Sequence, residues 1–273
     1  MLKICAMILA MLCLCGCTHS VSVGETTGEM KIAFLGDKAE DAILLYDGDF
    51  AVLIDTGLNK TGAEIVAYLN KNGIEKLDLM LITHYDKDHV GGADTVLENI
   101  AVDRVIGPNY MSDSKQFTQF EKAARKKGKE IELLSSDAHI SFGPLSLQID
   151  APDMLYEQEN DRSLVVRAQY GECSLLLAGD AEKDRIAELL GEGIEPCTLL
   201  KMPHHGRIED NSGAFISAAR PQIAVITSHE EEMEDAAVVT MLKSAGAQVY
   251  LTRLGLVEGT CDGHTIKLEQ TMY

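Results

Sequence analysis

Positive charge is scarce in this chain of 273 residues. Its 24 Lys and Arg stand against 43 Asp and Glu, which gives a formal net charge of -19 at pH 7. Such an acidic chain repels nucleic acid on average, so nucleic-acid binding requires a local basic patch or bridging cations. The densest basic run, residues 122–129, falls on a predicted helix at 114–127. We favour a solvated helix face whose last cations suit the helix dipole.

A hydrophobic run long enough to cross a bilayer is also missing. The apolar run from Ile4 to Leu14, behind Lys3, has the length of a targeting segment. It ends in Leu14-Cys15-Gly16-Cys17, which resembles a bacterial lipobox. Residues 1–17 would then be a signal peptide, and Cys17 would carry the lipid of an exported lipoprotein anchored at the extracytoplasmic face of the cell membrane. The alternatives are a plain signal peptide or an uncleaved anchor.

Residues 18–29 are rich in Ser, Thr, Gly and Glu and are typical of a flexible tether. The domain would therefore meet the membrane only through the lipid. A disulfide framework is absent as well: three cysteines would leave with the signal, Cys17 would be acylated, and Cys173, Cys197 and Cys261 remain. We expect these three to be small buried hydrophobic residues in a fold that already has a large core.

Interior linkers and short-period repeats are missing too, so residues 30–273 are expected to form one domain. A hydrophobic content of 46% excludes general disorder. Short apolar strands with turn signals between them dominate each half. The expected helices are 62–70, 93–98, 114–127, 182–190, 212–219 and 235–245. This pattern predicts two sheets packed face to face with helices outside.

What the chain does have is a dense set of metal-ligand side chains directly after the predicted strand 77–82. The segment Thr83 to Gly92 carries His84, Asp86, Asp88 and His89 within six positions. Imidazole and carboxylate groups at this density are typical ligands of Zn²⁺, Mn²⁺ or Fe. Tyr85 and Lys87 alternate with them and are expected to face away. The Gly91-Gly92 pair lets the backbone turn tightly under the site.

Two later strands end in the same kind of residue. The apolar run 175–178 ends in Gly179-Asp180, and the run 199–203 ends in His204-His205-Gly206. Strand ends gathered at one edge of a sheet are where α/β folds build sites. We therefore expect Asp180 and the histidine pair to join the ligand loop.

The order of elements and these motifs resemble the metallo-β-lactamase superfamily over nearly all of residues 30–270. Within it, the chain looks most like the C-terminal extracellular domain of ComEC-type competence proteins. The segments that carry the resemblance are Asp55-Thr56-Gly57, Thr83 to Gly92, Asn160 to Val166, Leu177 to Asp180 and Lys201 to Gly206. The resemblance implies an α/β fold, the αββα sandwich of two mixed sheets.

The chain also departs from the superfamily pattern. Asp86 stands at the second histidine of the usual His-x-His-x-Asp-His motif. His139 is the one candidate for the third histidine, and Asn160-Asp161 occupies that interval as in ComEC-like domains. Residues 36–39 replace the expected Gly-Gln-Gly-Asp, and His229 lies where a His-Pro is expected.

The resemblance implies two divalent metal ions, Zn²⁺ or Mn²⁺. The first would be held by His84, Asp86 and a bridging Asp180. The second would be held by Asp88, His89, Asp180 and one histidine of the 204–205 pair. Four further residues would support the ligands or touch the substrate: Asp55, Asn160, Lys201 and His229.

A water between two metals would lose a proton and attack the substrate. Asp88, His204 and His205 are the expected catalytic residues, and the histidine that does not bind metal would donate to a phosphate oxygen. The implied function is a metal-dependent phosphodiesterase or nuclease acting on a phosphodiester, single-stranded DNA included. The alternatives are a hydrolase of another cell-surface phosphodiester, ester or lactone, and a non-catalytic metal-binding lipoprotein. Protein partners are left open by the sequence.

Overall fold

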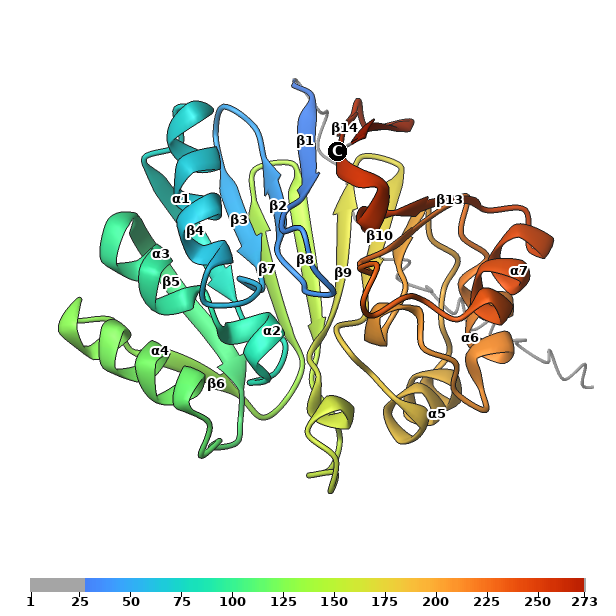
Figure 1. Cartoon of the computed structure of the whole chain (residues 1–273), viewed down its shortest axis with the longest axis horizontal. Coiled ribbons are helices and arrows are strands. Elements are labelled where there is room, and N and C mark those ends of the chain that lie inside the picture. The colour runs from blue at the N-terminus through green and yellow to red at the C-terminus, as the bar shows by residue number, and fades with distance from the viewer. Residues whose placement is uncertain (1–27, 273) are drawn as a thin grey trace, which may run out of the picture.

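The computed structural model describes residues 28–272, which form two β-sheets packed face to face between two layers of helices (Figure 1). The predicted signal peptide, Cys17 and the tether up to residue 27 lie outside the described residues. Within residues 28–272 no helix has the length and apolar character needed to cross a bilayer.

The first sheet has eight strands in the order β15-β14-β1-β2-β3-β4-β5-β6. Its strands are β1 (Met30–Phe34), β2 (Ile43–Tyr46), β3 (Ala51–Ile54), β4 (Lys76–Leu81), β5 (Ala101–Pro108), β6 (Ile131–Leu134), β14 (Gly255–Cys261) and β15 (Ile266–Met272). The helices that belong to this half are α1 (Thr61–Lys71), α2 (Lys87–Val90), α3 (Ala93–Asn99) and α4 (Lys115–Lys126).

The second sheet has seven strands in the order β13-β12-β11-β10-β9-β8-β7. Its strands are β7 (Ala138–Phe142), β8 (Leu145–Asp150), β9 (Val165–Tyr170), β10 (Cys173–Leu177), β11 (Leu199–Lys201), β12 (Ile223–Ile226) and β13 (Gln248–Leu251). The helices of this half are α5 (Lys183–Glu192), α6 (Ser212–Ala219) and α7 (Ala236–Ser244), with short 3₁₀ turns at Asn160–Arg162, His204–Gly206 and Thr252–Leu254.

Both sheets are mixed, because tight hairpins make antiparallel pairs and helical crossovers make parallel ones. The hairpin between β2 and β3 is antiparallel, whereas β3 pairs in parallel with β4 after the crossover through α1. In the second sheet β9 and β10 form a hairpin, and β10 to β13 run parallel. The parallel strands send their carboxyl ends to one edge, where the ligand loops begin.

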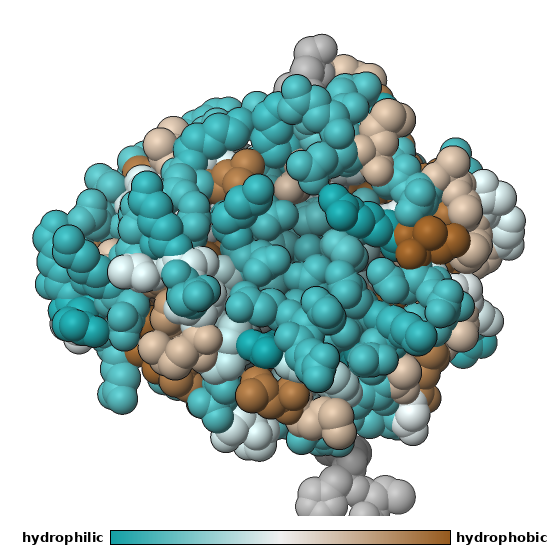
Figure 2. All heavy atoms as spheres, turned by 60° about the horizontal axis from the view of Figure 1, so that its bottom comes forward, coloured by the Kyte–Doolittle hydropathy of each residue, from teal (hydrophilic) through white to brown (hydrophobic). Residues whose placement is uncertain are grey.

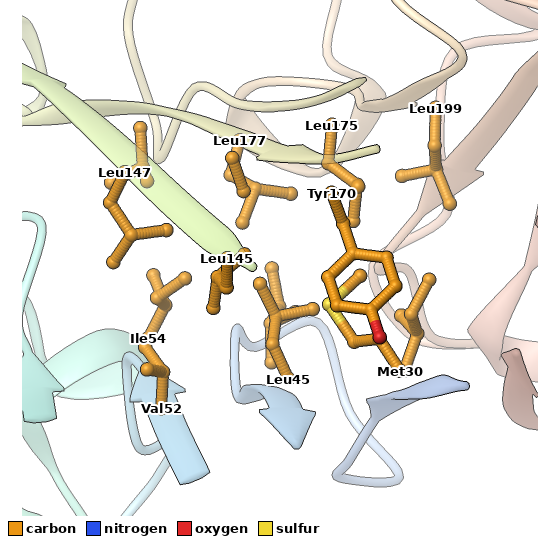
Figure 3. Close-up of a cluster of buried hydrophobic side chains, with 14 of the residues drawn as sticks. Met30, Leu45, Val52, Ile54, Leu145, Leu147, Tyr170, Leu175, Leu177 and Leu199 are labelled. Carbon is orange, nitrogen blue, oxygen red and sulfur yellow. The ribbon is translucent and has the colours of Figure 1, made fainter. Parts of the chain in front are cut away.

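Three apolar layers hold the sandwich together. Figure 3 shows the central layer, in which Leu45, Val52 and Ile54 of the first sheet face Leu145 and Leu175 of the second. The outer faces are covered by α1, α3 and α4 on one side and by α5, α6 and α7 on the other. Strands such as β2 and β3 are buried on both faces, which explains their uninterrupted apolar sequences.

The predicted fold class, an α/β sandwich of two mixed sheets with helices outside, is confirmed. Helix boundaries fall close to the expected ones, for instance Thr61–Lys71 for 62–70. Cys173, Cys197 and Cys261 are buried free thiols, as expected. The basic run on α4 forms an ion pair with the neighbouring helix α3, because Lys126 Nζ lies 2.8 Å from Glu98 Oε1.

Candidate metal centre

The three ligand segments meet at one edge of the sandwich. The ligand atoms of Asp88, His89, Asp180 and His205 all lie within 4.8 Å of one another. Asp180 is central, because its Oδ1 lies 3.2 Å from Nε2 of His89 and its Oδ2 lies 3.2 Å from Nε2 of His205. Asp88 closes the group, with its Oδ2 3.4 Å from the same nitrogen of His205.

The short helix α2 places Asp88 and His89 in this cluster. Asp86 precedes it with extended backbone (φ -68°, ψ 152°), and its carbonyl accepts the N–H of His89 at 3.0 Å. The two glycines that follow are needed for close packing: a Cβ at Gly91 would lie 2.3 Å from the Lys87 carbonyl, and one at Gly92 2.3 Å from the Thr56 carbonyl. α2 lies low in Figure 1, and Figure 2 turns that side of the molecule forward as a mostly hydrophilic face.

The backbone at the histidine pair is held in an unusual conformation. His204 and His205 have φ values of 48° and 50°, a left-handed region that costs non-glycine residues free energy. The surroundings fix it, since the His204 N–H donates to the Gly179 carbonyl at 3.2 Å and the Arg207 N–H to the His204 carbonyl at 2.9 Å. This turn directs His205, and not His204, into the cluster.

The imidazoles are oriented as metal ligands usually are. Nε2 of His84, His89 and His205 is buried in each case without a hydrogen-bond partner among residues 28–272. The other ring nitrogen is held: His89 Nδ1 lies 2.8 Å from Asp55 Oδ2, and His205 Nδ1 lies 2.8 Å from the Thr227 carbonyl. Buried polar atoms without partners are rare, and this arrangement fits a divalent ion facing the free nitrogens.

The charges of the cluster balance one another in the metal-free protein. Burial lowers the pKa of His205, but the neighbouring Asp180 and Asp88 outweigh it and raise that pKa to about 9. Burial also lowers the pKa of His89, which Asp180 and Asp55 raise well above its ordinary value. Burial raises the pKa of Asp180, yet His205, His89 and Lys201 hold it well below the usual range. A metal ion would therefore replace protons on the imidazoles.

The residues expected to hold the other metal are more loosely arranged. His84 Nε2 lies 4.0 Å from Asp86 Oδ2, and the Asp86 side chain is 43% exposed. The His84 and His89 rings are 4.0 Å apart between centroids, so His84 packs against a ligand of the tight set. Burial, together with Asp88, raises the pKa of Asp86 to about 6. The structure thus brings together one tight ligand set and leaves His84 and Asp86 as a looser pair beside it.

His204 lies beside the cluster with different neighbours. Its Nδ1 is 3.3 Å from Glu182 Oε1 and 3.7 Å from Glu209 Oε1, and its Nε2 is 3.5 Å from Asn160 Nδ2. Asn160 also donates to Glu182 Oε1 at 2.8 Å. Burial lowers the pKa of His204 despite the nearby Asp180, which favours the neutral imidazole at pH 7.

Asp55 lies behind the site. It is buried, with φ 59°, and accepts hydrogen bonds from the Thr83 N–H and Oγ1, both at 2.7 Å, as well as facing His89. Burial raises its pKa, while the charge on His89 opposes the shift. Asp55 therefore ties the end of β3 to the ligand loop and fixes the His89 ring, which is the supporting role expected for it.

Sequence reasoning missed Asp41, which lies behind the same site. Its carboxylate is buried, forms an ion pair with Lys201 and accepts a 2.6 Å hydrogen bond from Thr227 Oγ1. Lys201 Nζ also lies 3.5 Å from Asp180 Oδ1 and has no exposed surface. Lys201 is thus a buried counter-ion behind the ligands and is not on the cavity wall. The one signal for Asp41 was an acid directly before an apolar strand.

A cavity of about 660 Å³ opens over the cluster. Its wall carries cationic, acidic and histidine side chains: Lys38, Lys60, Lys87, Arg207, Asp86, Glu182, Glu231, Glu232, His204 and His229. His229 therefore lies on the cavity wall, and its Nε2 accepts a hydrogen bond from Lys38 Nζ at 2.7 Å. Lys87 was expected to face away and does not, because α2 is helical and alternation does not apply to it.

Three other side chains that the sequence made of interest do not reach the ligand cluster. Tyr85 is buried against the Phe117 ring at 4.4 Å and donates to the Pro108 carbonyl, which makes it a packing residue. His139 lies on β7 and faces Ser146, so the structure does not bring it to the cluster. Arg162 bonds the Tyr156 carbonyl at 2.7 Å and is not on the cavity wall.

Comparison with known proteins agrees with this geometry. Residues 23–229 match the family model of the metallo-beta-lactamase superfamily, so the chain belongs to that superfamily. It is 29% identical over 170 residues to ComE operon protein 3 of Bacillus subtilis, covering 60% of this chain and 21% of that protein. It is 29% identical over 193 residues to Recombination protein 2 of Haemophilus influenzae, covering 68% and 23%. These are ComEC-type competence proteins, and the chain spans less than a quarter of their length.

A solved structure supports the fold independently of sequence. The metallo-beta-lactamase fold protein YhfI from Bacillus subtilis superposes with a TM-score of 0.59 over 89% of this chain and 100% of that one, at 14% identity. At this identity the similarity concerns the fold alone.

Proposed function

We propose that the chain is a metal-dependent phosphodiesterase. One observation carries the proposal: Nε2 of His89 and Nε2 of His205, both buried without hydrogen-bond partners in the described chain, converge with Asp88 and Asp180 under a cavity whose wall bears cations. A divalent ion needs such ligands, and a phosphodiester needs positive charge around its oxygens.

The tight set Asp88, His89, Asp180 and His205 would hold one ion. His84 and Asp86 would hold a second one less firmly. Bound there, such ions lower the pKa of water toward neutrality and stabilise charge on the phosphoryl oxygens. The mixed imidazole and carboxylate ligands suit Zn²⁺ or Mn²⁺, and the carboxylates favour Mn²⁺ relative to a site richer in histidine.

His204 would bind the substrate rather than the metal. It lines the cavity beside Glu182 and Glu209, and the single N–H of its neutral ring can donate to a phosphoryl oxygen. Asp55 and Thr227 hold the metal-binding rings of His89 and His205 from behind. The rings of His89 and His205 thus each have one nitrogen fixed by the protein.

Relatives named for competence and recombination make single-stranded DNA one candidate substrate. The lipobox-like segment ending at Cys17 would place the enzyme at the extracytoplasmic face of the membrane. Substrates there include nucleic acid from outside and small phosphodiesters, and both share the same reacting group.

The test is hydrolysis of bis(p-nitrophenyl) phosphate by the purified chain with Mn²⁺ or Zn²⁺. Asp88→Asn should bind less metal and lose activity, because it removes a ligand charge. Asp113→Asn is the matched control, since Asp113 is exposed and its side chain makes no hydrogen bond or ion pair within residues 28–272. A wild type that binds metal but hydrolyses no phosphodiester contradicts the proposal, as does an Asp88→Asn variant with undiminished turnover.

A further inference from the structure

The cations on the cavity wall differ in how well they are neutralised. Lys60 forms an ion pair with Asp37, and Arg207 NH2 lies 3.3 Å from Glu232 Oε2. Lys38 Nζ lies 2.7 Å from His229 Nε2 and 3.8 Å from Glu231 Oε2.

Lys87 is the exception. Its side chain is exposed on the wall and makes no hydrogen bond or ion pair with any residue between 28 and 272. It is the first residue of α2, between Asp86 and Asp88, both of which also line the cavity. A lysine without a counter-ion among the described residues therefore lines the same cavity as the proposed ligands Asp88, Asp180 and His205.

We infer that Lys87 binds the reacting phosphate of a small phosphodiester and so sets the substrate class. The inference rests on the proposed phosphodiesterase function and specifies its substrate. An ammonium group at this place can contact a non-bridging phosphoryl oxygen, a charge-assisted hydrogen bond of the stronger kind. No rearrangement of an existing ion pair is needed for Lys87 to do so.

The rest of the wall selects against a long polyanion. Glu231 and Glu232 are exposed at the rim, and Glu182 lies beside His204. Each would repel a phosphate next to the one held by Lys87, and the net charge of -19 adds to this repulsion at long range. The cavity volume of about 660 Å³ is in the range that holds a small ligand. One phosphodiester with one negative charge therefore fits better than a DNA strand.

The experiment compares the wild type with Lys87→Met, Lys87→Arg and the control Lys243→Met, all loaded with Mn²⁺. Lys243 is exposed on α7 and its side chain makes no hydrogen bond or ion pair within residues 28–272, so the control changes net charge equally. Binding of inorganic phosphate is measured by calorimetry, metal content by mass spectrometry, and kcat and KM with a dinucleoside monophosphate and a single-stranded 20-mer.

We expect Lys87→Met to weaken phosphate binding about 10- to 100-fold and to raise KM by a similar factor, with metal content retained. Lys87→Arg should retain most of the binding, and Lys243→Met should match the wild type. The wild type should show a higher kcat/KM per bond for the dinucleotide than for the 20-mer.

Phosphate binding that Lys87→Met leaves unchanged overturns the role of Lys87. A 20-mer cleaved more efficiently per bond overturns the choice of a small substrate. If the wild type hydrolyses no diester but Lys87→Met still loses phosphate binding, the proposed activity fails while the anion site stands.

Discussion

The substitution Asp41→Asn tests whether Lys201 and Asp41 balance charge behind the metal ligands. Lys201 is fully buried, pairs with Asp41, and donates to the Gly179 carbonyl at 2.9 Å. Burial lowers the pKa of Lys201, but Asp41 and Asp180 outweigh it and raise that pKa above its ordinary value. The amine therefore stays charged, and it needs its counter-ion.

Removing one member of a buried pair costs about 3–5 kcal/mol, because the other charge remains buried. Asp180, 3.5 Å from the same ammonium group, keeps part of the compensation, so we expect the lower end, about 3 kcal/mol. The amide oxygen of the new side chain can still accept the hydrogen bond from Thr227. Adding Lys201→Met should recover most of the loss, since Asp180 retains His89 and His205 as partners.

The assay is urea unfolding of the metal-free chain in EDTA at pH 7, followed by far-ultraviolet circular dichroism. Asp113→Asn is the matched control, because Asp113 is exposed and its side chain makes no hydrogen bond or ion pair within the described part of the chain. A loss below about 1 kcal/mol, within the range of ordinary surface substitutions, would refute the reasoning. So would a double variant no more stable than Asp41→Asn.

Two further predictions concern the histidines. His205→Ala should lose bound metal, whereas His204→Ala should keep it. The His204→Ala variant should instead lose about 100-fold in kcat, the usual effect of removing one hydrogen-bond donor to the transition state. Equal metal loss in both variants would contradict the assignment of His205 as the ligand. In the metal-free chain the pKa of His205 is raised to about 9, so its stabilising contribution is complete below about pH 6.5 and is lost as pH rises toward 9. The urea midpoint in EDTA should fall over that pH window, while the affinity for Mn²⁺ rises. A midpoint that rises with pH there would show that His205 is not paired with Asp88 and Asp180.

The strand-end loops were predictable because each combines two local signals, an apolar strand and a ligand side chain directly after it. The run 77–82 before His84 and the run 175–178 before Asp180 are such cases, and both loops reach the same edge of the sandwich. The sheet class followed from the same pattern of buried strands and intervening helices.

What could not be predicted depends on conformation or on distant partners. His204 and His205 are chemically identical neighbours, and only their left-handed backbone decides which one reaches Asp180. Asp41 and Lys201 are far apart in sequence, so no local pattern reveals their ion pair. Lys87 was misplaced because alternation was applied to a segment that forms a helical turn.

The most direct measurement is an anomalous-diffraction map of crystals grown with Mn²⁺. The account predicts the strongest peak among Asp88, His89, Asp180 and His205, within bonding distance of the Nε2 atoms of both histidines, with any second peak weaker and beside His84. A strongest peak elsewhere, for example among Glu182, His204 and Glu209, would contradict it.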